Sequence, residues 1–260
     1  MENANWQVLV LMLLFSGVIL WKISSARKGK ELYIRPIPGL NAIDEAVGRA
    51  AELGAPLLFN PGLADFQNIQ TLAALGILQH VCKVAATYGT RIIVTTNVPV
   101  MVPICEDVMK SSFNEAGRPE MIHASEVRFV SDRSDLAALA NSRILIEEKV
   151  ASNFLFGAYD YTSLIFSEGG QIAGCMQIAG TADYYQIAFF IPSCDYVVMV
   201  EELFACSAYL SRQPTMLGSV VGQDYGKLVL LILVVIGVLA ATIFGHGNPI
   251  NLYEQVMNLK

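Results

Sequence analysis

The stretch RIIVTT, residues 91–96, has no polar side chain between its arginine and its two threonines. Residues 196–200, YVVMV, are likewise apolar nearly throughout. A strand that faces water on one side alternates apolar and polar residues, whereas a strand covered by helices on both faces does not. The two stretches therefore predict strands inside a sheet with both faces covered.

Short apolar runs alternate with helical patterns on either side of these stretches. A crossover between parallel strands needs about a dozen residues, which a helix normally supplies. We therefore predict an α/β fold with an open, mainly parallel, Rossmann-like sheet and helices on both faces. Its strands are predicted at 57–59, 91–95, 127–130, 153–156, 175–179 and 196–200, and its helices at 68–88, 102–116, 135–150, 161–168, 182–192 and 201–210. Strand order is not predicted.

Two charge-free apolar segments lie near the ends of the chain, Trp6–Trp21 and Leu228–Phe244. The mean hydropathy of +0.48, with 15% charged residues, is too high for an ordinary soluble protein. The second segment makes about 26 Å of helix, close to the thickness of a bilayer core. We predict an N-terminal and a C-terminal transmembrane helix flanking the sheet. A buried core helix is the alternative for the second segment, and a cleaved signal peptide for the first.

Basic residues follow the first segment instead of preceding it, which argues against a signal peptide. Positive charge marks the cytoplasmic side of a span. We expect an integral plasma-membrane protein with two spans, a cytoplasmic α/β domain and both termini outside. Its domains are a membrane anchor with basic collar (1–29), the α/β domain (30–226) and a span with a short external tail (227–260). The candidate contacts to lipid head groups are Lys22, Arg27, Lys28, Lys30 and Arg35.

The middle of the chain is acidic and contains all five cysteines. Residues 31–226 hold 21 of the 23 carboxylates and 11 of the 17 basic residues, a formal net charge of −10. This charge makes nucleic acid an unsuitable partner. The cysteines are odd in number and lack CxxC spacing, which indicates small buried side chains in a reducing compartment.

Proline and glycine mark the two junctions between the predicted spans and the α/β domain. Pro36, Pro38 and Gly39 end the first span, and Asn41 is the predicted cap of a helix whose apolar stripe includes Ile43, Ala46, Val47, Ala50 and Leu53. RQPTMLGSVVGQDYGK, residues 212–227, is interpreted as the connector to the second span. Within that span, Gly237, Ala241 and Gly245 form a candidate helix-packing face. Its partner is either the first span, through Ser16-Gly17, or a second copy; chance spacing is the alternative.

Polar residues follow the predicted strands, where open α/β sheets bind ligands. The candidate ligand-binding residues are Asn60, Gly62, Asp65, Thr95, Asn97, Asp132, Asp160, Thr181, Asp183 and Glu201. Asp, Asn and Thr at such junctions also serve as helix caps, an alternative that we weigh above catalysis. Asp132 and Glu201 together could hold a cation or act as acid and base, provided that they converge.

Common catalytic and cofactor motifs are absent from the sequence. It contains no GxxxxGK[ST], no GxGxxG after the first strand, no GxSxG and no HExxH. His80 is expected to be a packed side chain with one hydrogen bond. Cys105, near a helix start, is either a thiol activated by the helix dipole or a buried thiol. We therefore expect no cofactor, no metal site and no assigned catalytic residue, and whether the protein is an enzyme stays open, with a non-enzymatic role favoured.

Four segments together resemble a family of bacterial membrane proteins known only as a domain of unknown function. They are RPIPGLNAIDEAVGRAAELGAPLLFNPG, QIAGTAD, CDYVVMVEELFACSAYLS and GQDYGKL. The resemblance covers most of residues 33–230 and implies an anchored α/β domain with a membrane span nearby. It brings no activity and no catalytic residue.

Three functions are compatible with these observations. The leading hypothesis is a membrane-anchored scaffold or accessory subunit that forms a homo-oligomer or binds another membrane protein. The alternative is a cytoplasmic-facing binder or hydrolase of a small anionic or nucleotide-like ligand at the strand carboxyl ends. The third is a lipid-handling protein that uses the basic collar and nearby apolar helices.

Overall fold

The computed structural model describes residues 6–28, 38–211 and 214–244. The chain divides into two compact units. One unit combines Met1–Ile34 with Arg212–Lys260, and the other is Arg35–Ser211. The first holds a pair of long helices, and the second is the α/β unit.

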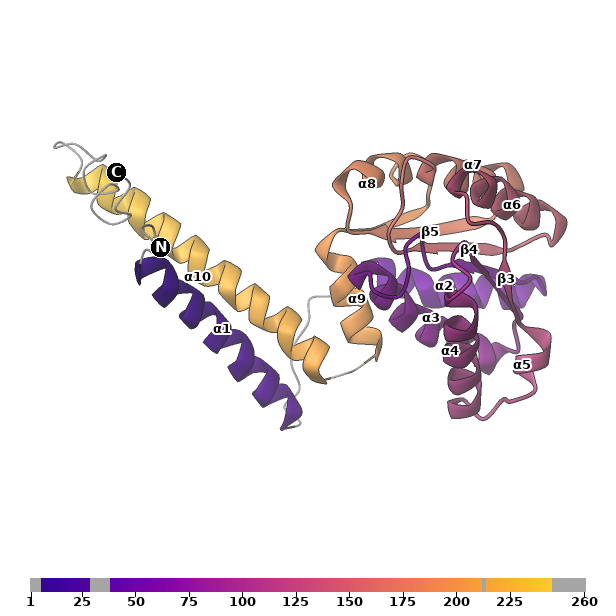
Figure 1. The fold of residues 1–260 in the computed structure, drawn as a ribbon, viewed down its shortest axis with the longest axis horizontal. Coiled ribbons are helices and arrows are strands. Elements are labelled where there is room, and N and C mark those ends of the chain that lie inside the picture. Colours follow the sequence, from indigo (N-terminus) through magenta and orange to yellow (C-terminus); the bar gives the residue numbers. More distant parts are fainter. Residues whose placement is uncertain (1–5, 29–37, 212–213, 245–260) are drawn as a thin grey trace. The chain divides into compact units, whose positions relative to one another are not determined.

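The α/β unit contains a six-stranded, open, all-parallel sheet (Figure 1). Its strands are β1 (Leu57–Asn60), β2 (Ile92–Thr96), β3 (Glu126–Phe129), β4 (Ser152–Phe156), β5 (Met176–Thr181) and β6 (Tyr196–Met199). They lie in the order β3-β2-β1-β4-β5-β6, so the chain reverses direction across the sheet between β1 and β4. The predicted fold class is confirmed, and each strand begins and ends within two residues of its prediction. β2 is buried throughout as predicted, but β6 is an edge strand whose Tyr196 and Met199 are exposed, so the prediction that YVVMV is covered on both faces was wrong.

Helices cover both faces of the sheet. Because successive residues of a strand point to opposite faces, neighbouring residues pack against different helices. Leu57 and Phe59 pack in one core cluster, whereas Leu58 packs in another. The first face holds α2 (Pro38–Leu53), α3 (Ile69–Tyr88), α4 (Met101–Glu115) and α9 (Glu201–Ser211), and the second holds α6 (Ser134–Glu147), α7 (Ser163–Ala173) and α8 (Tyr184–Phe190). A short helix that the sequence did not predict, α5 (Met121–Ala124), precedes β3.

The first helix of the α/β unit begins earlier than the sequence predicted. α2 begins at Pro38, so Asn41 lies inside the helix and is not its cap. Proline suits a first helical position because the amide there has no partner within the helix. The predicted stripe is buried at four positions, from Ile43 to Ala50, but Leu53 is exposed. Gly89 ends α3 as predicted, in the left-handed conformation.

The helix-pair unit consists of α1 (Trp6–Arg27) and α10 (Pro214–Phe244), which run antiparallel. The predicted connector is therefore helical from Pro214 onward. A Cβ atom on Gly218 would lie 2.5 Å from Ile23 Cα, and one on Gly222 would lie 3.0 Å from Ile19 Cα. A Cβ atom on Gly226 would lie 2.8 Å from the side-chain ring of Phe15. These three glycines, at four-residue spacing, let the two helices approach closely.

The predicted packing face of the second span does not make this contact. A Cβ atom on Gly237 would meet nothing within 4 Å, and neither would one on Gly17, where the partner face was expected. The side chain of Ala241, together with Gly245, lies outside the described residues. Sequence reasoning preferred the later glycines because polar neighbours such as Asp224 made residues 212–227 look like a connector.

Two described helices are long and apolar enough to cross a membrane: α3, and the Leu217–Leu239 part of α10. α3 has ten buried residues against the sheet and its neighbours, as a core helix does. Most of the α10 segment is exposed within the described chain, and its side chains from Leu230 to Leu239 are exposed on all sides. The predicted span at 6–21 is helical, although several of its side chains lie outside the description.

Candidate functional site

The point where the strand order reverses is the first place to look for a ligand in an open α/β sheet. Here it lies between the carboxyl ends of β1 and β4. Two loops border it, residues 61–68 after β1 and residues 157–162 after β4. We call these the β1 loop and the β4 loop.

Asn60, the last residue of β1, ties the strands together at this point. Its side-chain amide donates hydrogen bonds to the Thr95 carbonyl at 3.0 Å and to Thr95 Oγ1 at 3.2 Å. Asn60 Oδ1 accepts from the Gly62 amide at 3.0 Å and from the Tyr159 hydroxyl at 2.8 Å. The hydrogen-bonding groups of the Asn60 side chain therefore all have partners within the protein itself.

Two glycines bring the β1 loop and the β4 loop into direct backbone contact. Gly62 has φ +89° and Gly157 has φ +124°, a region in which side chains are strongly disfavoured. A Cβ atom on Gly157 would lie 2.3 Å from the Pro61 carbonyl oxygen, and one on Gly62 would lie 2.7 Å from the Ala158 amide nitrogen. The Leu63 amide also donates to the Ala158 carbonyl at 2.8 Å. The loops thus close the crevice at the switch point.

Tyr159 completes this closure from the β4 loop. Its ring packs edge-on against Phe166 of α7 and Phe190 of α8, with centroids 5.5 and 5.3 Å away. Burial raises the pKa of the Tyr159 hydroxyl well above its ordinary value. The phenol therefore stays neutral and donates a hydrogen bond to Asn60 Oδ1, which suits a structural tie and not a general base.

Three of the predicted carboxylates cap local backbone. Asp65 Oδ1 accepts from the Gln67 amide, Asp160 Oδ1 accepts from the Thr162 amide and hydroxyl, and Asp183 is the N-cap of α8. These bonds are the capping role that the sequence analysis kept as the alternative to ligand binding. The backbone thus accounts for the position of each of the three side chains.

Asp132 and Glu201, the proposed carboxylate pair, do not converge. Asp132 follows β3 and Glu201 follows β6, which are the two outermost strands. Five strand spacings of about 4.8 Å place them roughly 24 Å apart. No single cation or substrate group can lie between them.

The remaining predicted polar residues are buried near the strand ends. Thr181 Oγ1 lies 3.1 Å from Gln70 Oε1, which also accepts from the Ala182 amide, so β5 is tied to the start of α3. Asn97 donates to the Leu63 carbonyl at 3.0 Å, but its own Oδ1 has no hydrogen-bond partner within the described chain.

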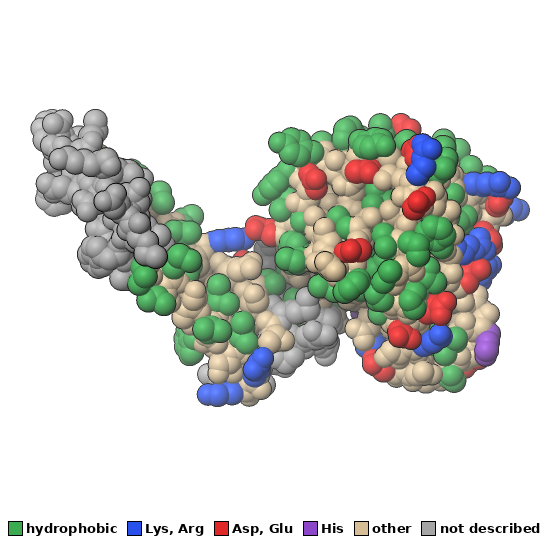
Figure 2. Space-filling view, viewed as in Figure 1, with side chains coloured by type: hydrophobic (Ala, Val, Ile, Leu, Met, Phe, Trp, Pro, Cys, Tyr) green, Lys and Arg blue, Asp and Glu red, His purple; other side chains and the backbone are tan. Residues whose placement is uncertain are grey.

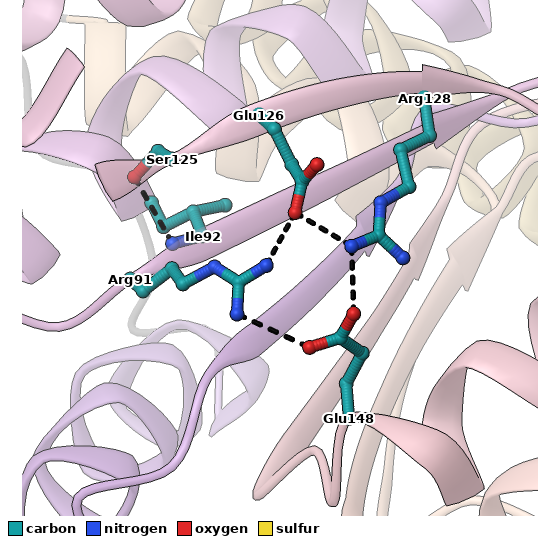
Figure 3. A network of polar contacts seen from close by, with 6 residues as sticks. All are labelled: Arg91, Ile92, Ser125, Glu126, Arg128 and Glu148. Carbon is teal, nitrogen blue, oxygen red and sulfur yellow. Dashed lines mark hydrogen bonds and ion pairs between the residues drawn. The ribbon is translucent and has the colours of Figure 1, made fainter. Parts of the chain in front are cut away.

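A second polar network lies at the opposite, amino edge of the sheet, and sequence reasoning missed it (Figure 3). Glu126 of β3 pairs with Arg91, just before β2, and with Arg128 at 2.7 Å. Glu148, the C-cap of α6, pairs with Arg128 at 2.6 Å and with Arg91 at 3.1 Å. The four side chains form a closed, charge-balanced ring. The i, i+2 spacing of Glu126 and Arg128 on one strand face was the available signal.

Hydrogen bonds from Arg128 lower the pKa of Glu126 and of Glu148, and those bonds raise the pKa of Arg128 in turn. Beside the ring, Ser125 Oγ accepts from the Ile92 amide at 3.1 Å. The ring side chains are about a quarter to two-fifths exposed, so water screens their attraction. A balanced ring whose charges satisfy one another suits a structural role.

His80 and Cys105, which the sequence analysis singled out, both lie in surroundings that suit a structural role. His80 Nε2 lies 2.9 Å from Asp44 Oδ1, so His80 makes the one expected hydrogen bond, although its side chain is 24% exposed and that of Asp44 is 57% exposed. Cys105 is fully buried, and burial raises its pKa to about 12. Its thiol is therefore protonated at neutral pH and unsuited to nucleophilic attack. Among the described residues, no group of three or more His, Cys, Asp or Glu side chains could hold a metal ion.

The basic collar is described in part. Lys22 Nζ lies 3.6 Å from the centre of the Tyr225 ring of α10, and 5.1 Å from that of Trp21, so a cation–π contact holds it. Arg27 and Lys28 are exposed. Lys30 and Arg35 lie outside the described residues.

Residues 1–250 match the family model described as Domain of unknown function (DUF6754), and the chain belongs to this family. No curated protein and no solved structure matches the chain.

Proposed function

We propose that this protein is a membrane-anchored scaffold or accessory subunit whose α/β unit binds another protein. The observation that carries the proposal is the closed switch point. The position at which this fold usually takes a small ligand is filled by backbone contacts at Gly62 and Gly157 and by the Tyr159 side chain. With the switch point closed, a partner binds the outer surface of the α/β unit, because no ligand can enter between the two loops.

The anchor is supported by the surface of α10. Every side chain from Leu230 to Ile236 is at least 45% exposed, and all of them are Leu, Ile or Val. Burying one such side chain contributes about 1.5–3 kcal/mol, so a helix of this kind is unfavourable in water. A lipid bilayer surrounds such a helix on every side and removes all of these side chains from water. In this arrangement α1 and α10 span the plasma membrane, both termini are outside and the α/β unit is cytoplasmic.

The charge of the α/β unit supports a scaffold over the alternative, a binder of a small anionic ligand. The strand carboxyl ends carry Asp65, Asp132, Asp160 and Asp183, and these charges repel phosphate or carboxylate groups. The one basic side chain at this edge, Arg133, is paired with Asp135 at 2.6 Å. A nucleotide there would meet a closed switch point and a surplus of negative charge.

The test begins with membranes from cells that express the intact protein. We expect alkaline carbonate to leave the protein in the membrane, and native mass spectrometry in mild detergent to show a complex larger than one chain. Extraction by carbonate, or a particle that is always a single chain without a partner, would overturn the proposal. So would a thermal-shift screen in which a nucleotide or another small anion stabilises the protein.

Two matched substitutions in α10 sharpen this test. Gly218→Leu places a side chain against Ile23 and is expected to separate α1 from α10, whereas Gly237→Leu meets nothing in the described chain. If Gly237 faces a partner helix, the second variant alone reduces the larger complex without lowering the thermal stability of the chain. If neither variant changes the complex, assembly does not depend on α10.

A further inference from the structure

The carboxyl edge of the sheet is acidic. We define this edge as the six strand-to-helix loops together with the first turn of each following helix. Only one basic residue lies there, Arg133, and it is paired with Asp135. The carboxylates at this edge are Asp65, Asp132, Asp135, Asp160, Asp183, Glu201 and Glu202. The other nine basic residues of Arg35–Ser211 lie elsewhere in the sequence of the unit.

The same edge exposes large apolar and aromatic side chains from nearly every loop. Tyr185 is 82% exposed, Tyr161 is 74% exposed and Ile69 is 68% exposed. Further exposed members are Phe66, Val100, Leu136 and Tyr184. In Figure 2, basic side chains of this unit gather on the side of α5, and the side where α8 and α9 lie shows hydrophobic and acidic ones. Tyrosine and phenylalanine are enriched in protein interfaces because they bury much area with few rotatable bonds.

The closed switch point determines the kind of partner that fits this surface. Because the β1 loop and the β4 loop touch, a partner lies across the loops instead of entering between them. A broad acidic and aromatic surface complements a segment that carries Lys or Arg beside apolar side chains. An anionic membrane or a nucleic acid would be repelled by the same carboxylates.

We propose that the carboxyl edge is the docking surface of the α/β unit, and that its partner is a protein segment rich in basic and apolar residues. This inference rests on the proposed scaffold function and names the surface that performs it. The carboxylates steer and orient the partner, and the exposed tyrosines supply the buried area.

The experiment places a photoreactive benzoylphenylalanine at Tyr185 or at Tyr161, in the full chain in native membranes. The control position is Tyr88, which is 59% exposed at the end of α3 on the amino edge. We expect crosslinks from Tyr185 and Tyr161 to one other protein, through a peptide with net positive charge, and at least fivefold fewer from Tyr88. Crosslinks to lipid, to another copy of this chain or to a peptide without basic residues would overturn the inference.

A charge variant tests the electrostatic part without disturbing the fold. Asp65→Asn, Asp132→Asn, Asp160→Asn and Asp183→Asn together remove four charges, while asparagine retains the capping oxygen. We expect the Tyr185 crosslink to fall about fourfold or more, because each exposed ion pair contributes modestly. The matched control replaces Glu52, Glu115, Glu120 and Glu147 with Gln and should change the yield by less than about twofold.

The results separate this inference from the proposed function. Protein crosslinks from Tyr88 alone would overturn the docking surface but leave a scaffold that uses another face. Absence of protein crosslinks from all three positions, with a single-chain particle in native mass spectrometry, would overturn both. An equal loss in the two charge variants would show that overall charge, and not this edge, attracts the partner.

Discussion

The two edges of the sheet are stabilised in different ways. At the amino edge, four long side chains form a ring of ion pairs that is partly open to water. At the carboxyl edge, the β1 loop and the β4 loop are held together by the buried Asn60 side chain and by backbone contacts at Gly62 and Gly157. The ion-pair ring at the amino edge tolerates substitution, because water can replace a lost partner. The contact at the carboxyl edge tolerates little substitution, since no side chain fits between the two backbones.

Substitution of the carboxyl-edge glycine should give the largest difference between the edges. Gly157→Ala places a Cβ against the Pro61 carbonyl at a φ of +124°, and we expect a loss of about 3–5 kcal/mol in the free energy of unfolding. Gly54→Ala at the amino edge has φ +62° and open space, so we expect about 1–2 kcal/mol. Denaturant unfolding of both variants measures this difference, and equal losses would contradict it.

The next largest effect is expected at Asn60. Asn60→Ala removes the side-chain acceptor of the Tyr159 hydroxyl and of the buried Gly62 amide, and the amide that bonds Thr95. We therefore expect a loss of about 2–4 kcal/mol in unfolding free energy, although Tyr159 keeps the Asn60 carbonyl and Thr95 keeps Asn141. Tyr159→Phe removes one hydroxyl and leaves Asn60 Oδ1 bonded to the Gly62 amide, so about 1 kcal/mol is expected. Thermal unfolding in the same detergent compares the two. A Tyr159→Phe effect as large as that of Asn60→Ala would show that the hydroxyl dominates the closure.

A change in the amino-edge ring should have a smaller effect. Arg128→Met leaves Glu126 and Glu148 with Arg91 alone, and the partial exposure of the ring limits the expected loss to about 1 kcal/mol. The loss should shrink further in about 0.5 M salt, because screening weakens exposed pairs. A loss that does not change with salt would show that Arg128 acts through packing.

The smallest effect is the pH dependence of the ring. Because Arg128 lowers the pKa of Glu126 and Glu148 below their ordinary 4.5 in the folded protein, these groups stabilise the fold above about pH 4.5. That stabilisation is lost as the pH falls through the lowered pKa values. The stability difference between wild type and Glu148→Gln should therefore be full at about pH 7 and decrease below about pH 4.5. A difference that grows toward low pH would contradict the assignment.

Local patterns predicted the secondary structure well because apolar strands and glycine helix stops are local signals. RIIVTT became a buried strand, and Gly89 ended the helix before it. The prediction failed where polar residues lie in a helix that is stabilised by contacts with a distant segment of the chain. Gln223 and Asp224 made residues 212–227 look like a connector, although the glycines among them pack α10 against α1.

The candidate site was only partly predictable for a related reason. Strand ends located Asn60, Thr95 and Asp183 because such polar residues mark the junctions of α/β folds. Strand order, which separates Asp132 from Glu201, depends on contacts between segments far apart in the chain. The closure at Gly157 depends on a backbone angle and a distant loop, neither of which a local pattern shows.

The contact between Gly62 and Gly157 also bears on how this family can diversify. Because each glycine accommodates the backbone of the other loop, a larger residue at one position requires the opposite loop to move. Homologous sequences should therefore keep both glycines or lose both together. A branch of the family that lacks the pair would be the one in which an open crevice, and with it a small-molecule activity, has had the opportunity to evolve.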